Sequence, residues 1–259
     1  MRGFWKHLRT REDEFLRSAK PEYRHGVPFV SVSALAGQFY CEYKVENEFA
    51  LGRIETEAKD EGIQLHDELL PGVEITAEEF ARLVETKEPS YAVLKVWGTV
   101  GGLRMVGMPD HIVWKAGRPL WLLELKTTKG ETASLWEDQL SQVIIYGLLL
   151  DLMGFDCSKL RLALVRLRAH ELSDESRRMW IMKVSKALIK NNVKELESTH
   201  GAGMRVHVIP HDRQAATRAV LAKRGYWIGE REPSSSTSVG KCRACEYNRV
   251  CAKTLYRPV

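Results

Sequence analysis

Two carboxylates and one lysine near the middle of the chain have the types and spacing needed to hydrolyse a phosphate ester. Asp110 ends the turn-forming segment GMPD, and the strand-like segment PLWLLELK carries Glu124 and Lys126 near its end. Side chains alternate along a strand, so Glu124 and Lys126 point to the same face. A hairpin at Gly117 would lay the strand that follows Asp110 against this one and bring Asp110 and Glu124 together.

A divalent cation is the natural partner for these two carboxylates. The second strand is apolar on both faces, with Leu120 and Leu122 expected on the Glu124 side, which is typical of a buried strand. Charge at its end needs compensation, and two carboxylates with a backbone carbonyl and waters form a typical Mg²⁺ or Mn²⁺ site. The alternative is that Asp110 caps a turn, while Glu124 and Lys126 form an ordinary salt bridge.

The energetics of phosphate-ester cleavage also favour a metal. The reaction needs an acceleration toward the upper end of the enzymatic range, whereas one general base contributes only about 10²- to 10⁴-fold. A metal that stabilises phosphoryl charge and activates water supplies much of the remainder. Lys126 would then orient or deprotonate the attacking water, or offset charge on the phosphate.

Three further polar residues are candidates for the same site. Gln142 and Tyr146 stand four residues apart in QVIIY, so they share one face of a helix. They could contact nucleic-acid backbone or the water network of the site, or they could form the polar edge of an apolar helix. His66, in GIQLHDELL, could donate an imidazole to the metal or could lie on a helix surface.

Four of the five cysteines have the spacing of a metal site. Cys242 and Cys245 form a C-x2-C pair, Cys251 follows after five residues, and Cys41 is the candidate for a distant fourth ligand. A zinc ribbon usually has a second pair, whereas an iron–sulfur cluster takes four thiolates and tolerates a distant one. The spacing leaves both metals open. Cys157 is expected to be a small buried residue.

Composition is that of a soluble globular protein. Of the 259 residues, 44% are hydrophobic and 28% charged, and the formal net charge of +5 is weak evidence for a polyanionic partner. No apolar run reaches the length of a membrane span, and the N-terminal sequence lacks a secretory signal. We therefore expect no membrane association and a cytoplasmic location, where clustered cysteines more often bind metal than form disulfides.

Hydrophobic periodicity and turn residues predict an α/β fold with a mixed sheet and helices on its faces. Lys183, Lys186, Lys190 and Lys194 would share one face of a helix, either to bind phosphates or as a solvated surface. We expect helices at 42–70, 133–153, 174–198 and 211–225, and strands at 91–100, 103–114, 119–128, 159–168 and 204–210. A serine-rich linker at 232–240 leads into the cysteine segment.

The order of these motifs resembles a known family. His66, GMPD with Asp110, ELK with Glu124 and Lys126, and then QVIIY resemble the PD-(D/E)XK nucleases of the RecB type. With Cys41 in front and C-x2-C-x-Y-x3-C behind, the chain resembles their iron–sulfur branch. By size it is most similar to the CRISPR-associated single-domain nuclease of spacer acquisition, and the resemblance covers residues 30–255.

The resemblance implies a restriction-endonuclease-like core and three regions. These are an N-terminal helical region with the first cluster cysteine at 1–90, a RecB-like nuclease core at 91–231, and a linker with an iron–sulfur segment at 232–259. It also implies a role for each motif residue. His66, Asp110 and Glu124 would bind Mg²⁺ or Mn²⁺ with the Leu125 carbonyl, Lys126 would be catalytic, Gln142 and Tyr146 would support the site or DNA, and Cys41, Cys242, Cys245 and Cys251 would hold a [4Fe–4S] cluster.

The implied activity is that of a DNA exonuclease, a hydrolase acting on single-stranded ends, with 5′-to-3′ polarity. It would trim DNA fragments before a CRISPR integrase complex inserts them, in antiviral defence. One departure is Glu42, which follows Cys41 where the family commonly has proline. Two alternatives stay open, namely an end-processing nuclease of DNA repair or replication, and a non-catalytic iron–sulfur protein that binds DNA ends.

Overall fold

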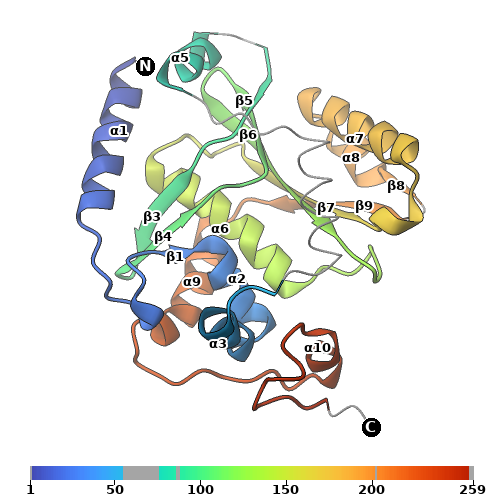
Figure 1. Cartoon of the computed structure of the whole chain (residues 1–259). Helices are drawn as coiled ribbons and strands as arrows, with labels where there is room; N and C mark the ends of the chain where they lie inside the picture. The colour runs from blue at the N-terminus through green and yellow to red at the C-terminus, as the bar shows by residue number, and fades with distance from the viewer. Residues whose placement is uncertain (1, 55–75, 86–87, 202, 257–259) are drawn as a thin grey trace.

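The protein is built around a mixed six-stranded sheet. The structure, a computed structural model, describes residues 2–54, 76–85, 88–201 and 203–256. Within these ranges the strands follow the order β2-β5-β6-β7-β9-β8, with β6 and β7 parallel and the other neighbours antiparallel (Figure 1). Their bounds are β2 Ser90–Ala92, β5 His111–Lys115, β6 Arg118–Thr127, β7 Arg161–Leu167, β8 His200–Gly201 and β9 Met204–Pro210.

Helices cover both faces of this sheet, as the sequence predicts. One face packs on α6 (Glu137–Met153), with α2 (Val32–Tyr40) and α9 (Arg213–Trp227) behind it. The other face packs on α7 (Asp174–Ile189) and α8 (Val193–Ser198) (Figure 1). The mixed α/β class predicted from the sequence is therefore confirmed.

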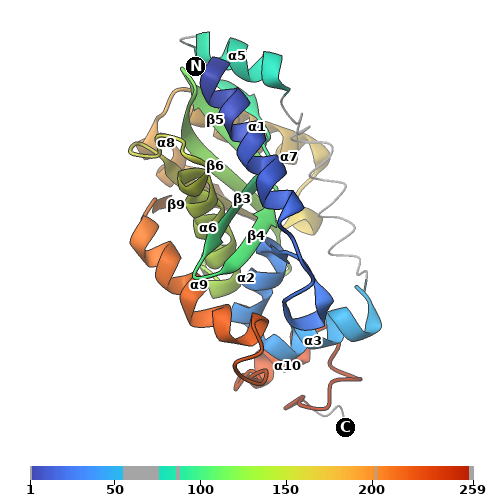
Figure 2. The same ribbon diagram turned by 90° about the vertical axis from the view of Figure 1, so that its left-hand side faces the viewer.

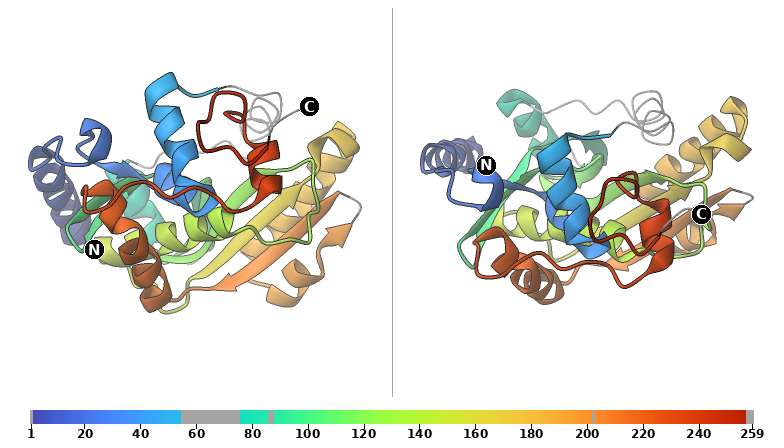
Figure 3. Two further views of the ribbon diagram at one scale, coloured as in Figure 1. Left: turned by 90° about the horizontal axis from the view of Figure 1, so that it is seen from below. Right: turned by 60° about the horizontal axis from the view of Figure 1, so that its bottom comes forward.

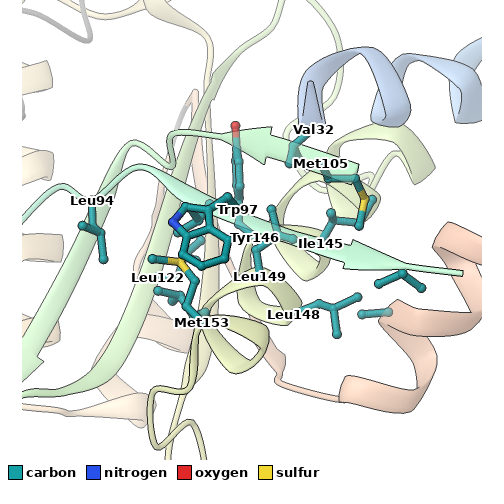
Figure 4. Packing of buried hydrophobic residues seen from close by; sticks show 14 of the residues in the cluster. Val32, Leu94, Trp97, Met105, Leu122, Ile145, Tyr146, Leu148, Leu149 and Met153 are labelled. Carbon is teal, nitrogen blue, oxygen red and sulfur yellow. The ribbon is translucent and has the colours of Figure 1, made fainter. Parts of the chain in front are cut away.

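A smaller sheet lies over α6. In the described part of the chain it has the order β1-β4-β3, with bounds Val30–Ser31, Leu103–Gly107 and Val96–Val100. The hairpin between β3 and β4 turns at Gly101 and Gly102, both with positive φ, a conformation that glycine adopts readily. Figure 4 shows Ile145, Leu148 and Leu149 of α6 in the buried cluster that also holds Met105 of β4.

The N-terminal helix α1 (Arg2–Arg17) joins the same hydrophobic core. Trp5 stacks on Phe80 of α5 (Ala77–Glu85) with 4.7 Å between ring centroids, and Phe15 lies 5.1 Å from Trp97 of β3. Figure 2 shows α1 running alongside the small sheet. These contacts give the residues before Cys41 a packing role, and the three-part division of the chain stays a prediction.

The hairpin that carries the two predicted carboxylates forms at the expected turn. Ala116 and Gly117 both have positive φ, 50° and 74°, which is the pattern of a two-residue type I′ turn. β5 and β6 pair with a register shift between Val113 and Trp114. That irregularity turns Leu120 to the α7–α8 side, while Leu122 stays on the α6 side. The prediction that Leu120 shares the face of Leu122 and Glu124 was therefore wrong.

The long helix predicted at 174–198 is interrupted. Asn191 adopts a left-handed φ of 52° between α7 and α8, and its side chain accepts a hydrogen bond of 2.9 Å from Trp121 Nε1. Asparagine tolerates this conformation better than most residues, which explains the break. Lys194 lies on α8, so the predicted single row of four lysines on one helix does not form.

The C-terminal segment folds back against the N-terminal half. It contains α10 (Val239–Ala244) and lies beside α3 (Glu42–Leu51), which begins directly after Cys41 (Figure 3). Tyr40 donates a 2.6 Å hydrogen bond to the Lys241 carbonyl across this contact. In the described ranges no helix combines the length and apolar character needed to cross a bilayer.

Candidate active site

The fold brings Asp110 and Glu124 together, as the hairpin argument predicted. Asp110 immediately precedes β5, and His111 pairs with Leu123 in the β5–β6 register. Asp110 Oδ2 accepts a hydrogen bond of 2.6 Å from the amide of Leu125, the residue after Glu124. Asp110, Glu124 and Lys126 therefore converge at one end of the hairpin, and we call these three residues the acidic centre.

Glu124 is the most constrained member of the acidic centre. Only 1% of the residue is exposed. Its Oε1 accepts two hydrogen bonds of 2.7 Å, one from Lys126 Nζ and one from Gln142 Nε2. Its Oε2 is buried and has no hydrogen-bond partner within the described residues. A buried carboxylate oxygen without a partner is costly, so this atom fits a cation ligand.

Burial and neighbouring charges set the protonation states of Glu124 and Lys126. Burial first, and the charge of Asp110 second, raise the pKa of Glu124 to about 7, with Lys126 and the backbone amide of Asp110 acting in the opposite direction. Burial alone would lower the pKa of Lys126, but the charges of Glu124 and Asp110 outweigh it and raise that pKa. Lys126 is thus an ammonium group at neutral pH, which suits orienting water or offsetting phosphate charge better than removing a proton.

α6 supplies the supporting side chains. Gln142 Nε2 also lies 3.3 Å from the hydroxyl of Tyr146, so the two predicted partners contact each other and Gln142 contacts Glu124. Burial and the charge of Glu124 raise the pKa of Tyr146, which stays a neutral phenol. Figure 4 shows Tyr146 among the buried residues of α6. The structure supports the predicted shared face, and the functional roles of both residues stay predictions.

A glycine that sequence reasoning left without a role makes this approach possible. A Cβ atom added at Gly107, the first residue of GMPD, would lie 2.6 Å from Tyr146 Cε1 and 2.9 Å from Val32 Cγ2. β4 can therefore reach α6 closely only if this residue lacks a side chain. The position of the glycine beside a predicted site was the only local signal in the sequence.

Two of the predicted metal ligands, Asp110 and Glu124, lie close together. Within the described residues, no group of three or more histidine, cysteine, aspartate or glutamate side chains is arranged to hold a metal ion. Asp110 and Glu124 are two carboxylates with suitable chemistry, and the predicted Leu125 carbonyl belongs to the same strand. His66, the remaining predicted ligand, lies outside the described residues. The buried Oε2 of Glu124 shows that the residues present fit a divalent cation.

A cleft opens beside Lys126. Its walls come from the N-terminal part of α2 and one side of α3, so these two helices lie beside Lys126 of the acidic centre. Hydroxyl and basic side chains line it together with the exposed ring of Phe49. The lining residues are Ser31, Ser33, Ala34, Gly37, Lys44, Val45, Glu48, Phe49, Arg53 and Lys126.

The four predicted cluster cysteines line a single pocket. Cys41 precedes α3, Cys242 and Cys245 belong to the α10 region, and Cys251 follows in the C-terminal loop. All five cysteines of the chain lie in the described ranges and are free thiols. The fifth, Cys157, is 6% exposed, as expected for a packed residue. The donor chemistry suits a soft metal, although no three of these thiols meet the geometry of a metal site within the described residues.

Glu42 fixes the chain beside this pocket. The residue is 1% exposed and accepts hydrogen bonds of 2.6 and 2.5 Å from Arg231, and of 2.7 and 2.8 Å from the amide and hydroxyl of Ser234. Two residues further on, the Ser236 amide lies 3.4 Å from Cys41 Sγ. Glu42, Arg231 and Ser234, here called the Glu42 latch, give the departure from proline a structural explanation.

Comparison with known proteins identifies the family. A family description of the PD-(D/E)XK nuclease superfamily matches residues 34–252, which include the acidic centre and all four pocket cysteines. The chain belongs to the PD-(D/E)XK nuclease superfamily. A solved structure described as "Crystal structure of SSO0001" is 16% identical, with 96% of this chain and 95% of that chain covered and a TM-score of 0.47. No curated protein gives a match.

Membership of the nuclease superfamily confirms part of the sequence interpretation. Nucleases of this superfamily are hydrolases that commonly use Mg²⁺ or Mn²⁺, in keeping with the acidic centre described above. The iron–sulfur branch, the exonuclease polarity and the CRISPR role stay predictions.

Proposed function

We propose that this protein is a metal-dependent DNA exonuclease that acts on single-stranded ends with 5′-to-3′ polarity. The observation that carries the metal-dependent hydrolysis is the buried Glu124, which lies beside Asp110 and Lys126 and keeps one oxygen without a hydrogen-bond partner among the described residues. A structural salt bridge rarely leaves such an atom buried, because an unpaired charged oxygen in the interior costs on the order of several kcal/mol. The preference for single-stranded ends and the polarity are proposed on the family resemblance alone.

Each residue of the acidic centre would have a separate role in the reaction. Asp110 and Glu124 would hold the cation, and Gln142 would keep Glu124 in its orientation. Lys126, which is protonated at neutral pH, would offset charge on the phosphate and orient the attacking water. When bound, Mg²⁺ or Mn²⁺ supplies stabilisation of phosphoryl charge and a more acidic water. The cleft beside Lys126 would admit the DNA strand.

A labelled oligonucleotide assay tests this proposal. Single-stranded DNA should be shortened from its end with Mg²⁺ or Mn²⁺ and remain intact with EDTA. Lys126→Ala should abolish cleavage while binding persists, whereas Lys115→Ala, which alters an exposed lysine of β5, should cut like the wild type. A wild-type protein that binds ends without cutting under any metal would establish the non-catalytic alternative instead.

The biological setting is proposed on the resemblance alone. The order of the motifs, with cysteines at both ends, supports a nuclease that trims DNA fragments for the CRISPR spacer integrase. End processing in repair or replication uses the same chemistry, so the two settings differ in partner and not in site. Neighbouring genes that encode an integrase, together with co-purification of the two proteins, would distinguish them.

We further propose that Cys41, Cys242, Cys245 and Cys251 hold a [4Fe–4S] cluster. The support is the meeting of these four thiols in one pocket from both ends of the matched region. Freshly purified protein should be brown and contain iron and sulfide. Cys245→Ser should bleach it, while Cys157→Ser, the same exchange outside the pocket, should leave the colour unchanged. Stoichiometric zinc in a colourless protein would establish the alternative metal.

A further inference from the structure

Trp136 is an exposed aromatic residue at the start of α6, the helix that also carries Gln142. It ends the segment between β6 and α6 and directly precedes the first residue of α6. It is 41% exposed. The chain has seven tryptophans, all within the described ranges, and the other six are buried or only partly exposed. Leu135, directly before it, is also 41% exposed, so two neighbouring large apolar side chains stay exposed just before α6.

A buried arginine supports one face of the Trp136 ring. The guanidinium carbon of Arg166 lies 4.7 Å from the indole centroid, within the range of a cation–π contact. Arg166 is 0% exposed and donates hydrogen bonds to the Ser134 carbonyl and, at 3.2 Å, to Thr128 Oγ1. The indole is therefore held from beneath by a side chain that is itself fixed by the 128–134 segment.

This assembly lies next to the reacting groups. Arg166 of β7 is the Cα partner of Lys126 of β6 in the parallel register, so the two basic residues stand side by side on neighbouring strands. Trp136 precedes Gln142, which contacts Glu124, by six residues of α6. At the rise of an α-helix this separation is about 9 Å along the axis. A DNA strand with one phosphate at the acidic centre therefore passes near this end of α6, where one of its bases can stack on the indole.

We propose that Trp136 stacks on an unpaired base of the DNA strand whose phosphate lies at the acidic centre. This inference rests on the proposed nuclease function and names a residue that would distinguish single-stranded from duplex substrate. An indole supported by a fixed cation offers a flat, preorganised surface that any base can cover, whereas a base inside a duplex is already stacked on both sides.

Tryptophan fluorescence provides a direct test. Binding is measured with Ca²⁺ in place of Mg²⁺, using a single-stranded oligothymidine and a blunt duplex of matched length. The single strand should quench the wild-type emission, and the duplex should quench it much less. Trp136→Phe should keep close to the wild-type Kd but lose the quenching. Trp136→Ala should raise the Kd about 5- to 150-fold, the range expected for one stacked base.

A matched control uses Trp180 of α7, which is only partly exposed. Trp180→Phe should keep both the affinity and the quenching. If Trp136→Ala binds like the wild type, or if Trp180→Phe loses the quenching, the stacking assignment is overturned. Equal quenching by single strand and duplex overturns it as well. Cleavage by wild-type protein with Mg²⁺, measured in parallel, separates this failure from failure of the proposed nuclease function.

Discussion

Two glutamates, Glu124 and Glu42, are equally buried, but their pKa values are shifted in opposite directions. Each is 1% exposed. Burial and Asp110 raise the pKa of Glu124 to about 7, whereas the pKa of Glu42 is lowered. For Glu42, burial alone would raise the pKa, but hydrogen bonds from Arg231 and Ser234 outweigh it. Burial by itself therefore does not distinguish a functional carboxylate from a structural one.

The difference lies in how completely each carboxylate is satisfied. Both oxygens of Glu42 accept hydrogen bonds, from Arg231, Ser234 and Gln38. Glu124 keeps Oε2 buried without such a partner in the described part of the chain, and a second carboxylate stands close by. The satisfied glutamate joins two segments, whereas the other keeps Oε2 available for a cation in addition to the Lys126 ammonium at Oε1.

The largest expected effect comes from removing the second carboxylate of the acidic centre. Asp110→Asn keeps the size of the side chain but weakens cation binding, so the cleavage rate with Mg²⁺ should fall by at least about 10³-fold, equivalent to several kcal/mol of lost transition-state stabilisation. The measurement is the rate of single-strand digestion at one fixed Mg²⁺ concentration, chosen to saturate the wild type.

Asp156→Asn is the matched control for that experiment. Asp156 lies in the loop after α6 and pairs with the exposed Arg118 at 3.2 Å. Its exchange should leave the rate near that of the wild type. Equal losses in the two variants would show that Asp110 has no special place in the chemistry, and the contrast between Glu124 and Glu42 would then have no catalytic meaning.

A second prediction concerns pH and the metal-free protein. The pKa of Glu124 is about 7 in the folded protein, against an ordinary value of 4.5 for a glutamate in the unfolded chain, so the folded state binds its proton more tightly. Its contribution to stability is fully present below pH 4.5 and is lost as pH rises through 7. The loss is about 3 kcal/mol, at about 1.36 kcal/mol for each unit of pKa difference.

Urea unfolding in EDTA at about pH 5 and about pH 8 measures this loss. Glu124→Gln cannot ionise at this position, so its stability should depend less on pH than that of the wild type, and the difference between the two proteins isolates Glu124 from other titrating groups. Adding Mg²⁺ at the higher pH should stabilise the wild type more than the variant. Parallel pH curves for the two proteins would contradict the raised pKa.

Sequence reasoning reached the acidic centre because its signals are local. Strand alternation places Glu124 and Lys126 on one face, and the Gly117 turn sets the register that brings Asp110 to them. Helical spacing likewise placed Gln142 and Tyr146 together. Each of these inferences needs only residues that are close in sequence.

What the sequence did not predict depends on register irregularities and distant partners. The bulge that redirects Leu120 is a shift in strand pairing that the alternation pattern does not predict. At the helix break, Asn191 contacts Trp121, a residue 70 positions away. The Glu42 latch joins residues 189 positions apart, so no local sequence pattern predicts it. From the sequence, Arg166 is one more basic residue of a strand. Only the structure shows that it is buried and contacts the Trp136 ring.

The smallest of the three expected effects tests the structural glutamate. Glu42→Ala removes the acceptors of Arg231 and Ser234, and it should lower the free energy of unfolding by about 2 kcal/mol, less than a fully buried pair because the Arg231 side chain is 37% exposed. Thiol-reagent labelling of Cys41, Cys242, Cys245 and Cys251 in metal-free protein should become faster, because the latch no longer fixes the segment next to Cys41.

Glu171→Ala, which breaks an exposed pair with Arg168, should change stability by less than about 1 kcal/mol and leave labelling unchanged. If Glu42→Ala behaves like Glu171→Ala, the latch does not hold the cysteine pocket, and the satisfied glutamate is no more structural than a surface charge.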